Sequence, residues 1–180
     1  MWNITEYGID DKKIEVLIFS EPINNILVGK VSSQAFVEDI AIGFYQHDDI
    51  DFGFACLARE SDGSKPRIFI EPELAEKLKN GTEEAKLILF HEIGHYVNND
   101  QNPNDADLER ENAIRNEYVS IKELFADEFA ASYIGKDAAI TGLEQLAQNI
   151  RDKYYEHADE ESFSLAMREI ELRIEHLRMK

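Results

Sequence analysis

The sequence predicts an α+β fold in which a small, mostly antiparallel N-terminal sheet is followed by helices. Apolar residues alternate with polar ones in short runs over residues 1–71, as on half-buried strands. Over residues 72–180 they recur every three or four positions, as on amphipathic helices. The length of 180 residues suits one domain. We therefore expect a single domain, 1–180, with strands (1–71), a first group of helices (72–135) and a C-terminal helical part (136–180).

Alternating runs define the expected strands, and turn-forming residues separate them. The runs are Ile14, Val16 and Ile18; Ile26 and Val28; Phe52, Phe54 and Cys56; and Ile68 and Ile70. The turns fall at residues 21–25, 48–51 and 61–66, which are rich in Pro, Asn, Asp, Ser and Gly. Residues 36–45 fit a strand or a helix, and the alternation of Ile40, Ile42 and Phe44 favours a strand. We expect Arg67–Ile70 to be an edge strand.

The change of period after Pro72 marks the beginning of the helical part. Leu74 and Leu78 have the spacing of a short helix that Asn80 and Gly81 can end. Thr82 is a suitable N-cap for the next helix, because two glutamates follow it in the first turn, where negative charge is favourable. This second helix is expected to run to about Val97.

Three further helices are expected in the second half of the chain. An apolar stripe predicts a helix that ends near Gly135. The stripe consists of Ile114, Tyr118, Ile121, Phe125 and Phe129. Thr141 and Glu144 form a possible capping box at the start of another helix, and residues 160–178 form the last, highly charged one.

Charge and composition exclude several classes of function. Lys and Arg total 19 against 37 for Asp and Glu, a net charge of -18. Such a charge repels phosphate backbones and anionic lipids, so we expect no direct nucleic-acid binding and no membrane binding. Cys56 is the only cysteine, which excludes an intrachain disulfide, and it is expected to be a buried small hydrophobe. No signal peptide or membrane span is expected, so the predicted location is the cytoplasm.

The segment His91-Glu92-Ile93-Gly94-His95 carries the main chemical signal. Residues four apart lie on one face of a helix, so both imidazoles can bind one ion. Glu92 is rotated by about 100° around the helix, which places its carboxylate beside the ion, where it can act as a general base. An ordinary amphipathic helix that happens to carry two histidines is the alternative.

A third ligand must come from another segment, and a carboxylate is the expected donor because no second cysteine exists. Glu123 is the preferred candidate for this ligand. The alternative is that Glu123 is one of many solvated acids, since other glutamates compete with it: Glu109, Glu111, Glu117 and Glu128. Asp127 lies four residues later on the same face and can accept a hydrogen bond from a metal-bound histidine. Ala126, Ala130 and Ala131 are small enough to let this helix approach the histidine helix closely.

Several other residues have weaker signals. His47 lies in an acidic loop that could bind a cation but reads better as a solvated turn. Phe125, Phe129 and Tyr133 have the spacing of core residues. A stabiliser for the oxyanion of a hydrolytic reaction could be any of Tyr133, Tyr154, Tyr155 and His157.

The combined pattern, the His-Glu-x-x-His segment followed by Glu123-x-x-Ala126-Asp127-x-Phe129-Ala130, resembles the gluzincin metallopeptidases. It is most similar to the ImmA/IrrE-type family over about residues 68–135. The resemblance implies a zincin-like fold, a Zn²⁺ cofactor and a small cytoplasmic enzyme that cleaves a DNA-binding repressor. Asp127 stands where that family commonly has Asn.

The leading functional hypothesis is a zinc-dependent endopeptidase that cleaves a regulatory protein partner, with His91, His95 and Glu123 as metal ligands and Glu92 as catalytic base. Its substrate would lie extended along a sheet edge near Arg67–Ile70. The alternative is a non-catalytic zincin-fold protein that sequesters a basic or DNA-binding partner, which the net charge would favour. A purely structural zinc ranks last, because such sites usually have four ligands dominated by Cys and His. The pattern indicates no particular oligomeric state.

Overall fold

The computed structural model describes residues 1–8, 11–24, 26–44, 54–58, 65–100, 113–154 and 159–180. Six strands come first: β1 (Trp2–Tyr7), β2 (Lys13–Ile23), β3 (Leu27–Ser33), β4 (Ile40–Phe44), β5 (Ala55–Ala58) and β6 (Arg67–Ile70). The helices follow: α1 (Pro72–Lys79), α2 (Glu83–Val97), α4 (Ile121–Ile134), α5 (Lys136–Tyr154) and α6 (Glu160–Met179). The predicted α+β class, with a mostly antiparallel N-terminal sheet, is confirmed.

The strands form one sheet in the order β1-β2-β3-β4-β6-β5. Neighbouring strands are antiparallel except β4 and β6, which run parallel with Ile42 opposite Ile68. The expectation that Arg67–Ile70 is an edge strand is therefore wrong, because β6 lies between β4 and β5 and β5 forms the outer edge. Strand β1, at the opposite edge, was not among the strands expected from the sequence. It has no buried residue and lacks a clear apolar alternation.

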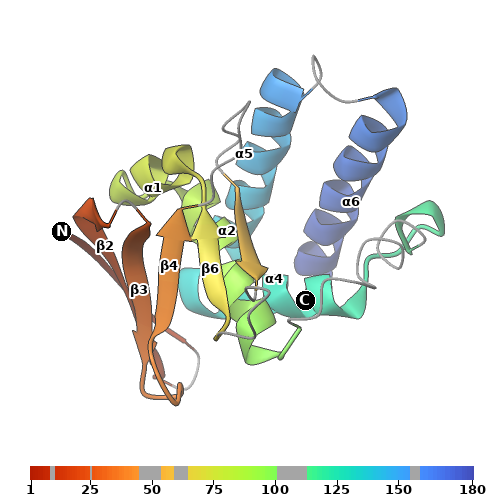
Figure 1. Ribbon diagram of the computed structural model, residues 1–180. Coiled ribbons are helices and arrows are strands. Elements are labelled where there is room, and N and C mark those ends of the chain that lie inside the picture. The colour runs from red at the N-terminus through yellow and green to blue at the C-terminus, as the bar shows by residue number, and fades with distance from the viewer. Residues whose placement is uncertain (9–10, 25, 45–53, 59–64, 101–112, 155–158) are drawn as a thin grey trace.

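The core lies between one face of the sheet and the helices. The strands contribute alternate aliphatic residues to it, among them Ile14, Val16, Ile42 and Ile68, and the helices cover this face with fully buried side chains such as Leu74, Leu89, Phe90 and Ile93. In Figure 1 the sheet stands on one side of the molecule, α2 lies beside it, and α5 and α6 rise side by side on the other side. Helix α2 is thus the central element, in contact with α1, α4, α5 and β5.

The predicted limits of α1, α2 and α6 agree with the structure. Helix α1 ends at the Asn80 C-cap, and Thr82 caps α2 by accepting a hydrogen bond from the amide of Ala85 at 3.4 Å. Glu83 and Glu84 lie in the first turn of α2, as expected. The predicted helix at 160–178 is α6, whose N-cap is Asp159.

The predicted apolar stripe from Ile114 to Phe129 does not form one helix. Glu117 has a left-handed backbone conformation (φ 64°), which interrupts the helix, and α4 begins only after the Ser120 N-cap. Tyr118, Ile121 and Phe125 are 56%, 82% and 38% exposed, so they are not core residues. Tyr118 and Ile121 keep a helical spacing in the sequence, but they point to solvent because the backbone turns before α4 begins.

The structure changes two further predictions. Helix α5 begins at Lys136, directly after Gly135 (φ 93°), so Thr141 and Glu144 lie inside this helix and form no capping box. Cys56 is exposed, because it lies on the outer strand β5. Phe52, the loop at 48–51 and the turn at 61–64 lie outside the described residues. Within the described parts of the chain, no helix is both long and apolar enough to cross a lipid bilayer.

Candidate metal centre

Two histidines from the middle of α2 form the base of the candidate site. His91 and His95 are separated by one helical turn, and their Nε2 atoms lie 3.0 Å apart. The two rings meet edge to face, with centroids 4.6 Å apart. His91 is buried and His95 is partly exposed, so the pair lies at the boundary between the core and a cleft. Two imidazole nitrogens this close must share a proton or a cation, since their lone pairs repel each other.

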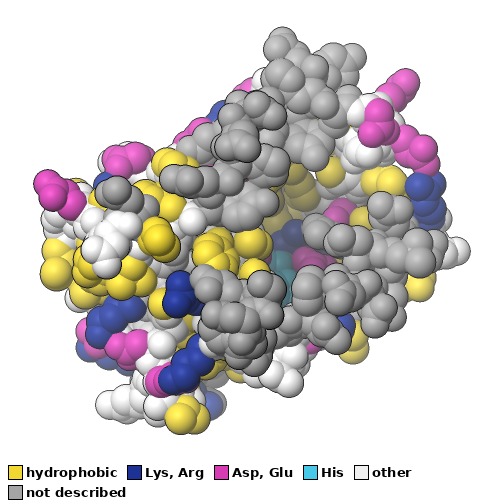
Figure 2. All heavy atoms as spheres, in the orientation of Figure 1, with side chains coloured by type: hydrophobic (Ala, Val, Ile, Leu, Met, Phe, Trp, Pro, Cys, Tyr) yellow, Lys and Arg dark blue, Asp and Glu magenta, His cyan; other side chains and the backbone are white. Residues whose placement is uncertain are grey.

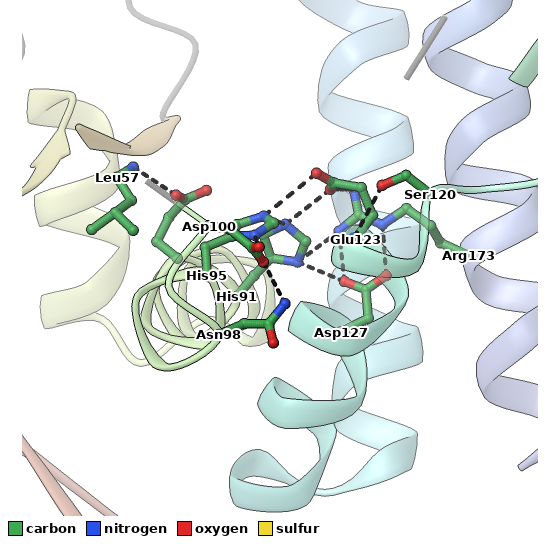
Figure 3. Close-up of polar contacts among 10 residues, drawn as sticks. Leu57, His91, His95, Asn98, Asp100, Ser120, Glu123, Asp127 and Arg173 are labelled. Carbon is green, nitrogen blue, oxygen red and sulfur yellow. Dashed lines mark hydrogen bonds and ion pairs between the residues drawn. The ribbon is translucent and has the colours of Figure 1, made fainter. Parts of the chain in front are cut away.

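Helix α4 supplies the third group. Its N-cap Ser120 accepts a hydrogen bond from the amide of Glu123 at 3.4 Å, which places Glu123 in the first turn. The Glu123 carboxylate lies 3.1 Å from His91 Nε2 through Oε2 and 3.4 Å from His95 Nε2 through Oε1. One ligand atom from each of the three residues falls within 4.8 Å of the others, so the group could hold a metal ion. Figure 3 shows the three side chains pointing toward one another from the two helices.

Small residues allow α4 to approach α2 closely, as expected from Ala126, Ala130 and Ala131. The first two are fully buried, and Ala131 is partly exposed. Gly94 was not singled out from the sequence, but a Cβ built on it would lie only 2.9 Å from the Cα of Ala126. The two backbones are therefore in direct contact at this point, and only glycine fits there.

Asp127 occupies the place that its spacing from Glu123 predicts. Its side chain is completely buried, and its Oδ1 lies 2.8 Å from Nδ1 of His91. The other histidine also has a carboxylate near its far nitrogen, because Asp100 Oδ2 lies 3.5 Å from His95 Nδ1. Asn98 holds Asp100 by donating a hydrogen bond of 2.7 Å to the same oxygen. Carboxylates in these positions orient imidazoles for ion binding.

Arg173 in α6 is the site residue that the sequence analysis missed. It donates two hydrogen bonds to Asp127, from Nε to Oδ2 at 2.7 Å and from Nη2 to Oδ1 at 2.6 Å. Its Nη1 also lies 4.0 Å from Glu123 Oε2. A signal was present in the sequence, since Arg173 falls on the same face as the buried residues Ile170 and Leu177. An arginine on the apolar face of a helix indicates a buried acidic partner.

Burial and close charges shift the pKa values of this network. Burial alone would raise the pKa of Asp127, but the charges of Arg173 and His91 lower it to about 2. Burial and Arg173 oppose a positive charge on His91, yet Asp127 and Glu123 raise the pKa of His91 to about 9. Burial would likewise raise the pKa of Glu123, and its hydrogen bonds to His91 and His95 hold that pKa well below the ordinary value. Both carboxylates are therefore ionised at neutral pH, as a cation site requires.

Glu92 lies in the same cleft but has a different partner. Its Oε2 accepts a hydrogen bond of 2.7 Å from the backbone amide of Leu57, in the outer strand β5. Burial raises the pKa of Glu92, and the nearby imidazoles and the Leu57 amide oppose this shift only in part. A carboxylate with a raised pKa is a better proton acceptor than an ordinary surface glutamate.

The cleft has a volume of about 370 Å³ and lies between β5, α2, α5 and α6. Figure 2 shows histidine, acidic and basic side chains at the bottom of this hollow, with hydrophobic side chains beside them. His91, His95, Glu123 and Glu92 all line it, and so does Arg173.

Among the proposed oxyanion stabilisers, Tyr133 contacts the rings of Phe90 and Phe129, with centroids 5.7 Å and 5.0 Å away, and does not line the cleft. Its position agrees with the core packing expected from its spacing. His47, Tyr155 and His157 lie outside the described residues, and of Tyr154 only the backbone belongs to the described part. Among the lysines and arginines in the described parts of the chain, Arg173 is the one that lines the cleft.

Comparisons with known proteins add no assignment. No protein-family model, no curated protein and no solved structure matches this chain.

Removal of the Arg173 guanidinium should destabilise the fold strongly. In Arg173→Met, Asp127 stays buried without its cation, so we expect the free energy of unfolding to fall by about 3–5 kcal/mol in urea denaturation. Arg168→Met is the matched control, because Arg168 lies on the same helix and forms exposed pairs with Glu117 and Glu171. The control should lose about 1 kcal/mol or less. Equal losses in the two variants would contradict a special role for Arg173.

The metal-free protein should become less stable between pH 6.5 and 9. His91 has a raised pKa of about 9 in the folded state against 6.5 for an ordinary histidine, so its stabilising contribution is complete below pH 6.5 and is lost as the pH rises through 9. The raised pKa of Glu92 has the same sign, because stability falls as the pH rises from the ordinary glutamate value through a raised folded-state pKa. Urea denaturation in the presence of a chelator at both pH values measures the change. His91→Gln should flatten the pH dependence and His176→Gln should keep it, whereas the same slope in both variants would refute the assignment.

Proposed function

We propose that the protein is a zinc-dependent endopeptidase of the gluzincin type with a zincin-like fold. The observation that carries this proposal is the convergence of His91, His95 and Glu123 on one point of a cleft that also contains Glu92. Three ligands with a carboxylate beside them are typical of a catalytic zinc site that keeps one position open. A structural site would ordinarily be closed by four ligands.

The donor set fits zinc in chemistry and in spacing. Zinc in proteins takes imidazole nitrogen and carboxylate oxygen at about 2.0–2.2 Å, and ligands around a tetrahedral ion then lie about 3.3 Å apart. The two Nε2 atoms of His91 and His95 lie 3.0 Å apart, and the Glu123 carboxylate lies 3.1 Å from the first through Oε2 and 3.4 Å from the second through Oε1. Mg²⁺ and Ca²⁺ prefer sites made of oxygen alone, so two imidazoles disfavour them.

The side chains of the cleft can then carry out peptide hydrolysis. Zinc, when bound, would acidify water and polarise the substrate carbonyl. Glu92 would take the proton of the attacking water and deliver it to the nitrogen of the departing amine. The amide of Leu57 fixes one oxygen of Glu92 and leaves its other oxygen available for this proton. Asp127 would hold the His91 ring in the correct orientation through Nδ1.

The outer strand β5 offers a place for an extended substrate. An exposed sheet edge can add a further strand through backbone hydrogen bonds, which gives affinity for many sequences. Because β5, and not Arg67–Ile70, is the outer strand, the expected substrate position moves to Ala55–Ala58. Ala55, Cys56 and Leu57 line the same cleft as the metal ligands.

A DNA-binding repressor is the proposed substrate class. Two features support it: the resemblance of the motif pattern to the ImmA/IrrE-type family, and the net charge of -18, which would attract a basic protein from solution. The same charge would also favour the alternative, a non-catalytic protein that sequesters such a partner. Variants of Glu92 separate the two functions.

The purified protein should contain about one zinc per chain, and loss of one ligand should lower this content markedly. Glu123→Ala removes a ligand, whereas Glu128→Ala on the same helix removes a partly exposed carboxylate that pairs with His176 and Lys180. Elemental analysis after dialysis against a zinc buffer should show the loss only in Glu123→Ala. Absence of zinc from the wild type would remove the basis of the proposed function.

Substitution of the base should separate metal binding from catalysis. Glu92→Gln keeps the shape of the side chain, so it should retain zinc and lower the rate of hydrolysis by about 10²–10⁴. His91→Ala should lose both properties. The rate is measured by incubating the protein with a basic repressor in the presence of zinc and following the cleavage by electrophoresis. Hydrolysis that survives Glu92→Gln would refute the mechanism, and full biological effect of this variant would favour sequestration.

A further inference from the structure

The cleft extends beyond the metal ligands into an apolar recess. Its walls there are aliphatic and come from three helices: Leu87 and Ile88 in α2, Leu146 and Ile150 in α5, and Ala166 and Ile170 in α6. These side chains share the cavity of about 370 Å³ with the metal ligands, so the recess and the candidate metal centre are continuous. The proposed hydrolytic chemistry does not use any of these six residues.

Helical spacing places the recess next to the reacting groups. Ile88 precedes His91 by three residues and Glu92 by four, so it lies on the same face of α2, about 5.4 Å or one turn away along the axis. Ala166, Ile170 and Arg173 lie at positions i, i+4 and i+7 of α6, so this helix also leads from the recess to the site.

These dimensions fit one substrate side chain. An extended chain advances about 3.3 Å per residue, so a side chain that enters the recess belongs to a residue next to the bond at the metal centre. The six aliphatic wall residues offer no hydrogen-bonding group to a polar side chain, and Glu169 is the polar residue that α6 places among them. Ala166 is the smallest of the six wall residues, so a larger residue at this position would reduce the space of the recess.

We infer that this recess, lined by the six residues named above, binds a large aliphatic or aromatic side chain of the substrate beside the bond that is cut. The inference rests on the proposed peptidase function and names its preferred substrates. The one acidic wall residue on this face of α6 is Glu169, which is buried and lies one turn from the cation Arg173. An acidic substrate side chain would be repelled by Glu169, and Arg173 offsets the attraction that a basic one would feel.

Two peptidyl hydroxamates that differ only in one side chain test the recess without hydrolysis. The hydroxamate group binds the metal, and the adjacent side chain is isobutyl in one compound and methyl in the other. Titration calorimetry with the zinc-loaded protein should show at least about tenfold tighter binding of the isobutyl compound, because a hydrophobic pocket discriminates by this much even for small differences in size.

Ala166→Leu should reduce this preference to less than about threefold, since the added atoms fill the recess. Ser164→Leu is the matched control, because Ser164 is exposed on the same helix and does not line the cleft. Circular dichroism verifies that both variants are folded. If Ala166→Leu does not fold, Ile150→Ala replaces it and should raise the affinity for a bulkier, naphthyl compound relative to wild type.

Three outcomes would overturn the inference: equal affinity for the two compounds, tighter binding of an aminobutyl compound, or no binding of either compound to zinc-loaded protein. The aminobutyl result would assign the specificity to Glu169. Failure of the proposed function has a different signature, since it appears as absent hydrolysis or absent zinc and not as a lost preference between the two compounds.

Discussion

The close packing of α4 against α2 determines where the candidate ligands lie. Because Gly94 has no side chain, the backbone of Ala126 comes so close to it that a Cβ would not fit between them. Glu123 lies one turn before this contact, at the start of α4, so its carboxylate reaches both imidazoles of α2. A larger residue at the contact would push the two helices apart and move Glu123 away from the imidazoles. Backbone packing therefore sets the geometry of the site before any charge does.

Charge balance is the second constraint on the site. Burial of Glu92, Glu123 and Asp127 near one another carries a large desolvation cost, which neighbouring positive charges must offset. Arg173 offsets it on the side of Asp127 through two hydrogen bonds. A divalent ion on the opposite side, held by the imidazoles, would offset it further, which agrees with the proposed function. The site is thus a balanced set of charges, in which each histidine has a carboxylate close to its far nitrogen.

Local geometry explains how much of this arrangement was predictable. The limits of α2 follow from its cap, and residues four apart share a face of any helix, so spacing paired His91 with His95 and Glu123 with Asp127. The chemical need for a third metal ligand, and not spacing, joined the two pairs. The order of strands in the sheet and the role of Arg173 depend on contacts between segments far apart in the chain, for which spacing carries no information. The break before α4 was missed because Tyr118 and Ile121 continue an apolar period that the backbone does not follow.

The bond between Arg173 and Asp127 spans 46 residues, and this separation has a consequence for how the protein forms. During synthesis Asp127 leaves the ribosome well before α6, and a buried carboxylate without a partner is strongly unfavourable. Packing of α4 against α2 with Asp127 ionised is therefore more favourable when α6 supplies Arg173. The buried pair thus makes the stability of the α2–α4 contact depend on a helix that lies far away in the sequence.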